Sequence, residues 1–342
     1  MASWASRWWR APWWLLQLAT GAKSFVDNPI LGSDALNRHG LHAARLRTAH
    51  RLAWWRRRRL VRGVDPANRA AFDRDGFVAI PDFLPPDEFE RLRDFLLSSE
   101  CDGREHRQGD TVTRRVPIDP GLLDRSPELA RLLAMPKWRA LMRYVASTGG
   151  EPVYYLQSIV TGFDGPPDPQ IELHSDSFHP SLKAWLFLTD VAEDSAPLIY
   201  VPESHRLTPE RLKWEQRKSE TVATDGDRLS QRGSFRVSRE ELAELCLPQP
   251  VSFAVAANTL VVADTYGFHA RGTSQRPTVR VEIWAYRRRT PFLPWTGFDL
   301  LSLPGLAMRR AGWAYQLVDW LAARDLWQQH WSPSGRKRAT DR

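Results

Sequence analysis

The later half of the chain alternates short apolar runs with turn residues. Runs rich in β-branched and aromatic residues, bounded by Gly, Pro, Asp or Ser, predict β-strands. The expected strands cover residues 76–81, 153–160, 184–191, 198–202, 251–255, 259–263 and 279–286. Apolar residues at helical spacing predict helices over residues 68–74, 85–97 and 128–146. Helices followed by crowded strands favour a mainly β fold with flanking helices (α+β), built on a β-barrel or jelly roll.

Segments of different composition interrupt or follow this domain, which we place at residues 65–292. Residues 206–250 are polar and charged, and we interpret them as an insertion or lid over one end. Residues 102–118 are treated as a loop. Residues 293–342 are expected to form an amphipathic helix and a basic tail, and to pack on the domain or add to a membrane-facing surface. Their aromatic stripe consists of Trp313, Leu317, Trp320, Leu321 and Trp327.

The first 64 residues differ sharply from the rest in charge. They hold 12 of the 48 Arg and Lys residues but only 2 of the 40 Asp and Glu residues, together with 7 of the 16 tryptophans. The net charge of +8 therefore resides in this region, and the remainder is close to neutral. Such asymmetry indicates a separate role for residues 1–64.

Two helices are expected in this basic region, beginning near Pro12 and Ser33. The second places Leu41 and Leu52 on one side and most of its arginines elsewhere, which is typical of a basic amphipathic helix on anionic lipid. We therefore interpret residues 1–60 as a membrane-surface anchor. Packing of this helix on the domain, with its arginines in solvent, is the open alternative.

Two other interpretations of the basic region carry less weight. A secretory signal would fit Arg7 and Arg10 ahead of a short apolar run, but five tryptophans among the first 14 residues are more typical of an interfacial segment. Nucleic acid would also attract basic charge mixed with tryptophan, yet no recognition motif accompanies it. The two cysteines, Cys101 and Cys246, form no disulfide framework and indicate a reducing, cytosolic compartment.

A metal site is predicted from the segment Leu173-His174-Ser175-Asp176. Residues two apart in a strand point to the same side, so His174 and Asp176 can reach one ion. The best third ligand is His269, which follows a strand-like run. Two histidines and one carboxylate leave positions open for a co-substrate and oxygen, as non-haem iron(II) requires.

Several motifs in one order make the chain resemble the phytanoyl-CoA dioxygenase family. Residues 72–84 resemble the family's N-terminal motif, and His174-Ser175-Asp176 matches its His-x-Asp motif. Residues 196–205 resemble its segment ending in Pro-Gly-Ser-His, with Glu203 in place of the glycine. His269 precedes an arginine by eleven residues, as in the family. The resemblance covers residues 68–290 and implies a double-stranded β-helix, a jelly roll of the cupin type.

The resemblance also implies iron(II) held by His174, Asp176 and His269, and 2-oxoglutarate as co-substrate. Arg280 would hold the distal carboxylate of 2-oxoglutarate, since a guanidinium can bind a carboxylate through two hydrogen bonds. The alternative is a surface salt bridge from Arg280 to Glu282 or to a neighbouring residue. Gln157 is a candidate for a further contact to 2-oxoglutarate; the alternative is an ordinary amide in the core. Some family members carry a serine that contacts the co-substrate two residues after the distal histidine. Arg271 occupies that position here, and Thr273 is the residue that could make the contact instead.

The implied activity is that of a non-haem iron dioxygenase that hydroxylates a small-molecule or lipid-like substrate with release of succinate and carbon dioxide. Asp176 favours hydroxylation, because related halogenases carry a small residue at this position. Iron(II) and 2-oxoglutarate are cytosolic supplies, so we expect a cytoplasmic enzyme, peripheral on the inner face of a membrane. The alternative is a non-catalytic, membrane-associated binding or scaffold protein of the same fold.

Overall fold

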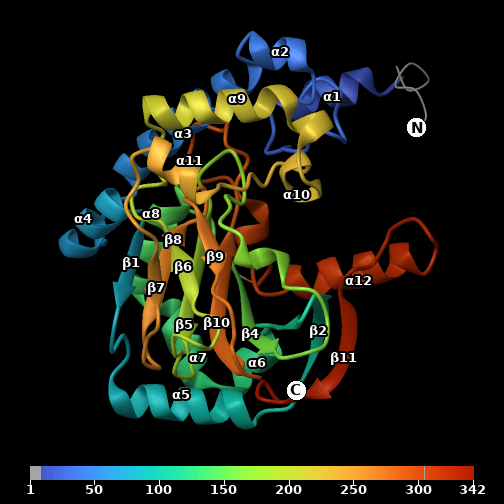
Figure 1. Cartoon of the computed structure of the whole chain (residues 1–342). Coiled ribbons are helices and arrows are strands. Elements are labelled where there is room, and N and C mark those ends of the chain that lie inside the picture. Colours follow the sequence, from blue (N-terminus) through green and yellow to red (C-terminus); the bar gives the residue numbers. More distant parts are fainter. Residues whose placement is uncertain (1–8, 304) are drawn as a thin grey trace.

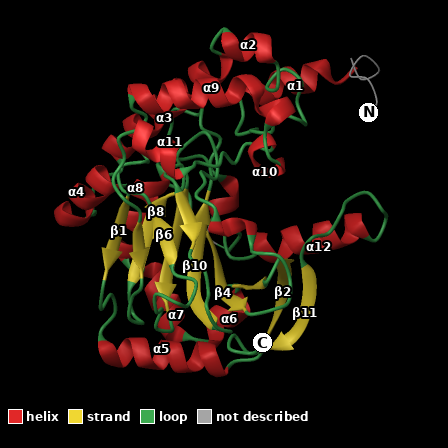
Figure 2. Ribbon diagram, in the orientation of Figure 1, coloured by secondary structure: helices red, strands yellow, loops and turns green. Residues whose placement is uncertain are grey.

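Two antiparallel β-sheets form the centre of the protein (Figures 1 and 2). The computed structural model describes residues 9–303 and 305–342. The strands are β1 (Phe77–Ile80), β2 (Cys101–Gln108), β3 (Thr111–Pro117), β4 (Val153–Thr161), β5 (Leu182–Phe187), β6 (Leu198–Tyr200), β7 (Val251–Phe253), β8 (Leu260–Asp264), β9 (His269–Arg271), β10 (Val279–Arg287) and β11 (Ser332–Lys337). The larger sheet has the order β1-β8-β5-β10-β4-β3-β2-β11, and the smaller one β7-β6-β9. This arrangement confirms the predicted fold class.

Helices surround the sheets rather than separating them (Figure 2). They are α1 (Ala11–Leu18), α2 (Asp34–Arg38), α3 (Leu41–Arg59), α4 (Pro66–Asp75), α5 (Pro86–Ser98), α6 (Pro120–Arg125), α7 (Pro127–Ala134), α8 (Pro136–Ala146), α9 (Pro209–Asp225), α10 (Arg228–Gln231), α11 (Arg239–Glu244) and α12 (Arg310–Ala322). The predicted helix over residues 128–146 is divided between α7 and α8. Met135 is extended there because it precedes Pro136, which disfavours the helical conformation.

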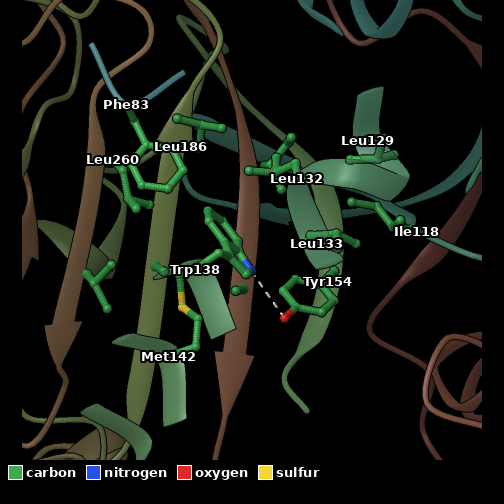
Figure 3. Close-up of a cluster of buried hydrophobic side chains, with 14 of the residues drawn as sticks. Phe83, Ile118, Leu129, Leu132, Leu133, Trp138, Met142, Tyr154, Leu186 and Leu260 are labelled. Atoms are coloured by element: carbon green, nitrogen blue, oxygen red, sulfur yellow. Dashed lines mark hydrogen bonds between the residues drawn. The ribbon is translucent and has the colours of Figure 1, made fainter. Parts of the chain in front are cut away.

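Strand alternation creates two cores on opposite faces of the larger sheet. Val281 and Ile283 of β10 join the core under α7 and α8, whereas Trp284 of the same strand joins the core between the two sheets. Figure 3 shows part of the first core, in which Trp138 donates a hydrogen bond to the hydroxyl of Tyr154 at 3.3 Å. The predicted division of β10 into an apolar and a functional side is therefore confirmed.

The interpretation of residues 102–118 as a loop is wrong. They form the β2–β3 hairpin, and the basic tail adds β11 to its edge. These strands are rich in charged residues and therefore lack the apolar signal used to predict strands. Main-chain hydrogen bonds to neighbouring strands define them instead.

The basic N-terminal helix packs on the domain, and the expectation that its arginines lie in solvent is wrong for Arg45, Arg56 and Arg57, which are buried. Arg45 donates hydrogen bonds to the carbonyl oxygens of Thr20 (3.0 Å) and Ala22 (2.8 Å). A guanidinium can donate hydrogen bonds to several carbonyl oxygens at once. These arginines therefore link segments of the N-terminal region to one another and to the domain. Arg7 and the tryptophans at positions 4 and 8 lie outside the described residues.

The segment 206–250 folds as α9, α10 and α11 and meets the N-terminal region. Figure 1 shows α9 running beside α3 across the top of the sheets. Polar contacts between the N-terminal helices and α9 include His42 of α3, whose Nε2 atom lies 3.0 Å from Glu215, and Asn37 of α2, which donates to the carbonyl oxygen of Ser219 at 3.0 Å. The N-terminal helices and this segment therefore form one layer over the end of the jelly roll.

A buried ion pair connects this layer to the larger sheet. Arg57 lies 2.7 Å from Asp264 at the end of β8, and the two side chains are 1% and 0% exposed. The Arg57 guanidinium also donates to the carbonyl oxygen of Val145 at 2.8 Å. Burial of two charges is tolerated only when each has such partners.

We expect Arg57→Met to lower the free energy of unfolding by about 3–5 kcal/mol, because the substitution leaves the Asp264 carboxylate buried without its counter-ion. Chemical denaturation would measure the change. Arg58→Met is the matched control, since Arg58 is exposed on the same helix and should change stability by less than about 0.5 kcal/mol. Equal stability of the two variants would contradict the role of the pair.

Candidate metal centre

His174, Asp176 and His269 converge in a cavity of about 260 Å³ between the sheets. Their candidate ligand atoms all lie within 4.8 Å of one another. The Oδ1 atom of Asp176 is 3.9 Å from the Nε2 atom of His174 and 3.6 Å from that of His269. Both histidines are buried, and the carboxylate is 16% exposed. The structure thus brings together the three predicted ligands.

Main-chain hydrogen bonds fix the positions of these ligands. His174 lies in an extended segment rather than in a named strand, and it pairs with His269 in both directions, at 3.0 and 2.9 Å. The amide of Asp176 donates to the carbonyl oxygen of Thr265 at 2.9 Å. Each ligand is therefore set by backbone geometry, as a preorganised site requires.

The second ring nitrogen of each histidine is also engaged. The Nδ1 atom of His174 lies 2.7 Å from the carbonyl oxygen of Glu172, and that of His269 lies 3.0 Å from the carbonyl oxygen of Gly267. In a neutral ring, Nδ1 then carries the proton and Nε2 keeps the lone pair that a metal needs. This donor set fits a divalent transition metal such as iron(II).

The turn before His269 has no room for a side chain at Gly267. A Cβ atom there would lie 1.9 Å from the hydroxyl oxygen of Tyr200, which is fully buried. That hydroxyl donates to the carbonyl oxygen of Asp264 at 2.8 Å. Glycine at this position therefore lets the chain turn tightly enough to bring His269 to Asp176.

Burial and neighbouring charges favour the protonation states that bind a metal. Burial lowers the pKa of His269 to about 4, helped by the nearby ammonium of Lys183. Burial, followed by the proximity of His269, also holds the pKa of His174 well below its usual value. Burial alone would raise the pKa of Asp176, but Lys183 and the two histidines outweigh it and keep that pKa well below its ordinary value. The site is therefore one carboxylate with two neutral imidazoles.

Lys183 on β5 is a site residue that the sequence did not reveal. Its ammonium lies 2.7 Å from the Oδ2 atom of Asp176 and 3.3 Å from the Nε2 atom of His269. It shares the inner face of the strand with Trp185, which also lines the cavity. The alternation of residues 183, 185 and 187 was the signal that could have identified it.

Arg280 faces the same cavity and is already paired. Its Nε atom donates to Glu282 at 2.9 Å, and a second nitrogen donates to the carbonyl oxygen of Ala196. Together with a longer contact to Glu282, these bonds use three of the five N–H donors of a guanidinium. The predicted salt bridge is therefore present but buried rather than on the surface, and two donors remain for a ligand.

Gln157 lines the cavity with its amide fully engaged. It donates to Glu282 at 2.7 Å and accepts a hydrogen bond from Arg115 at 2.7 Å. It therefore connects the carboxylate that pairs with Arg280 to a second cavity-lining arginine. Arg115 went unnoticed in the sequence because residues 102–118 were taken for a loop.

Thr273 is not brought to this cavity. It lines a neighbouring one, together with Asp168. Arg271 borders both cavities and forms an ion pair with Asp168, whose side chain is 1% exposed. The charge of Arg271 is thus balanced within the protein, and Thr273 does not substitute for the family's serine.

The model of the family described as phytanoyl-CoA dioxygenase (PhyH) matches residues 72–241. No curated protein sequence gives a significant match.

Three of the solved structures that are similar to this chain share little sequence identity with it. The non-heme alpha ketoglutarate dependent epimerase SnoN from nogalamycin biosynthesis is 21% identical over 70% of this chain and 94% of its own, with a TM-score of 0.41. HygX from Streptomyces hygroscopicus, with nickel and 2-oxoglutarate bound, is 18% identical over 66% and 87%, with a TM-score of 0.42. EctD from S. alaskensis, with bound iron, is 20% identical over 68% and 83%, with a TM-score of 0.41.

We expect Asp176→Ala to weaken iron(II) binding by more than about 100-fold, since loss of even an outer partner of a metal ligand costs about 10- to 100-fold. Anaerobic competition with a chelator would measure the affinity. Asp164→Ala is the control, because Asp164 is an exposed acidic residue outside the cavity. Similar affinities for both variants would place the metal elsewhere.

Proposed function

The chain belongs to the phytanoyl-CoA dioxygenase family of iron(II)- and 2-oxoglutarate-dependent oxygenases, and we propose that it hydroxylates a small-molecule or lipid-like substrate with release of succinate and carbon dioxide. The convergence of His174, Asp176 and His269 on one point carries this proposal. Asp176 supplies the carboxylate ligand that distinguishes a hydroxylating site from a halogenating one.

Each part of the proposed chemistry has a residue to perform it. His174, Asp176 and His269 would hold iron(II), and the two remaining donors of Arg280 would hold the distal carboxylate of 2-oxoglutarate. When bound, these two groups supply the oxidising power that places one oxygen atom of O₂ into a C–H bond. Glu282 and Gln157 keep the Arg280 guanidinium in place, and Trp185 forms an apolar wall of the cavity.

A second candidate, a non-catalytic binding or scaffold protein, is favoured by one observation. Lys183 balances the charge of Asp176 at 2.7 Å, and Glu282 balances that of Arg280 at 2.9 Å. Both functional charges are therefore satisfied within the chain. A scaffold would bind neither iron(II) nor 2-oxoglutarate measurably, which separates it from an enzyme.

We expect Arg280→Gln to raise the KM for 2-oxoglutarate by about 10-fold or more, because the variant loses a charge-assisted contact to the distal carboxylate. Succinate release would be followed with iron(II), oxygen and a cell lipid extract, and mass spectrometry would detect a product that gains one oxygen atom. Arg232→Gln is the control, since Arg232 is exposed on another element.

Loss of succinate release in Asp176→Ala and a raised KM for 2-oxoglutarate in Arg280→Gln, with normal kinetics in the Arg232 control, support the enzyme. Succinate release by the wild type that is unchanged in Asp176→Ala would exclude these ligands. Succinate without any oxygenated product, across lipid and polar extracts, would exclude hydroxylation of a molecule in those extracts.

We also propose that the protein is cytoplasmic and attaches to the inner face of a membrane through exposed aromatic residues. Within the described part of the chain, no helix has both the length and the apolar character to cross a bilayer. On α12, Trp313, Leu317 and Trp320 recur at intervals of four and three residues and are about half exposed. Such a stripe fits the interfacial zone of a bilayer.

Two further features support attachment near α12. Phe298, in the preceding segment, is 92% exposed. Arg324 stacks on Trp320 with its guanidinium carbon 4.0 Å from the ring centroid, so a cation accompanies the aromatic face. On α1, Trp13 and Leu16 are also exposed, and Figure 1 shows α1 and α12 both projecting to the right of the sheets. The proposed anchor thus combines α1 with α12, whereas α3 is occupied by packing.

We expect the triple variant Trp313→Ser, Leu317→Ser, Trp320→Ser to lose most flotation with anionic vesicles, because partial burial of each apolar side chain contributes about 1 kcal/mol or more. Ala314→Ser combined with Gln316→Ser is the control on the same helix. The intact chain is used, since Arg57 ties the N-terminal region to the fold. Equal flotation of wild type and triple variant, or none with either, would contradict attachment through α12.

A further inference from the structure

A second cavity adjoins the candidate metal centre. Its volume is about 490 Å³, and it shares Arg115, Asp176, Lys183 and Trp284 with the cavity that holds the histidines. The rest of its lining consists of Lys23, Val153, Tyr155, Tyr286 and Arg288. Four cationic side chains therefore surround a space whose lining holds one carboxylate, that of Asp176.

Most of this positive charge has no counter-ion. The Asp176 carboxylate is paired with Lys183 at 2.7 Å and would be committed to a metal. Arg115 is bound to the neutral amide of Gln157, and no acidic side chain of the described residues pairs with Lys23, Arg115 or Arg288. The Nε atom of Arg288 is buried and has no hydrogen-bond partner in the described part of the chain. Lys23, Arg115 and Arg288 are partly buried, and cations without partners in such positions are costly unless a ligand supplies the negative charge.

Two of these cations point at a single atom. The ammonium of Lys23 donates to the carbonyl oxygen of Asp176 at 2.6 Å, and Arg288 donates to the same oxygen at 3.4 Å. One neutral carbonyl cannot balance two positive charges. An oxyanion beside it would gain charge-assisted hydrogen bonds from both, and these are about twice as strong as neutral ones.

Aromatic rings form part of the same lining, and the Arg288 guanidinium carbon lies 5.8 Å from the centroid of the Tyr286 ring. The rings of Trp284 and Tyr286 lie parallel, 5.5 Å apart with an interplanar angle of 3°, and Tyr155 lies 5.9 Å from Trp284. Arg115 stacks on Trp284 with its guanidinium carbon 4.0 Å from the ring centroid. A ligand that fits these rings has a flat or apolar body attached to its anionic group.

We propose that this cavity binds the phosphate-monoester group of the substrate through Lys23, Arg115 and Arg288, with the substrate body lying on Trp284 and Tyr286 and reaching toward His174. A dianion matches three unpaired cations better than a single carboxylate does. The proposal rests on the proposed function, because the molecule bound here is the one that the metal centre would oxidise.

Two of the three residues proposed to recognise the phosphate lie outside the matched family segment, and the third, Arg115, lies within it. Lys23 lies in the N-terminal region and Arg288 just beyond β10, whereas the family model matches residues 72–241. The N-terminal region thereby gains a second role beside its structural one. It supplies a substrate contact that a chain lacking this region could not make.

Phenyl phosphate is a suitable probe, with phenol and benzoate as its neutral and singly charged counterparts. Titration calorimetry of the full chain, with and without iron(II) and saturating 2-oxoglutarate under anaerobic conditions, would measure binding. We expect phenyl phosphate to bind about 10-fold or more tightly than benzoate and phenol, and Arg288→Gln and Lys23→Met each to weaken it about 10-fold. Arg62→Gln is the control, because Arg62 is exposed and far from the cavity lining.

Two comparisons make the outcomes distinct. Arg280→Gln should weaken binding of 2-oxoglutarate and spare phenyl phosphate, while Arg288→Gln should do the reverse. Arg288→Lys keeps the charge and should retain most of the affinity for phenyl phosphate. A folding defect would instead lower the affinity of both Arg288 variants together with their melting temperature. In that case, the affinity of Lys23→Met for phenyl phosphate tests the proposal.

Equal affinity for phenyl phosphate and phenol, or displacement of phenyl phosphate by 2-oxoglutarate, would overturn the proposal. If that happens while iron(II) and 2-oxoglutarate still bind, the phosphate site fails and the proposed function stands. If phenyl phosphate binds but iron(II) does not, the proposed function fails and the anion site stands as a binding site.

Discussion

The buried ion pair between Arg57 and Asp264 is the constraint on which the candidate site depends. One oxygen of Asp264 meets Arg57 at 2.7 Å, and the other accepts the amides of Ser181 and Tyr266, each at 3.0 Å. Ser181 directly precedes β5, which carries Lys183, and Tyr266 lies in the turn that leads to His269. A single carboxylate therefore orders the two segments that meet at Asp176. Because Arg57 belongs to α3, the N-terminal region is part of the catalytic fold rather than an appendage to it.

Several arginine side chains join separate segments of this protein through hydrogen bonds and ion pairs in its interior. Arg45 and Arg56 are buried against carbonyl oxygens, Arg271 against Asp168, and Arg280 against Glu282. Each guanidinium carries five donors in a fixed plane, so one side chain can join several loops that have no regular structure of their own. Part of the basic composition that suggested lipid contact thus serves internal hydrogen bonding, through Arg45, Arg56 and Arg57, whereas most other arginines of the N-terminal region are exposed. The proposed membrane-facing surface rests on the exposed aromatic residues of α1 and α12.

The parts of the fold that follow from local pattern were predictable, and those that follow from distant partners were not. The alternation of β10 correctly separated Arg280 and Trp284 from Val281 and Ile283, and the two-residue spacing of His174 and Asp176 correctly suggested that these two side chains converge. The burial of Arg57 depends on a carboxylate 207 positions away, which no local periodicity can reveal. The β2–β3 hairpin was missed because its residues are charged and its strands are held by main-chain pairing. Lys23 reaches the site only because α3 and α9 fold its segment back over the sheets.

If iron(II) and the anionic ligands bind as proposed, the positive charge around Asp176 couples their binding. A divalent cation that approaches the two histidines meets Lys183, Lys23 and Arg288 nearby, and Lys183 already holds one oxygen of the carboxylate ligand. Coulomb repulsion therefore opposes the metal until anions occupy the adjoining space. An anion that neutralises these side chains must strengthen metal binding, and by linkage the metal must strengthen anion binding by the same factor. The ammonium of Lys183 keeps the Asp176 carboxylate ionised when no metal is bound. Because the same ammonium would repel the metal, metal binding would depend on anions bound nearby.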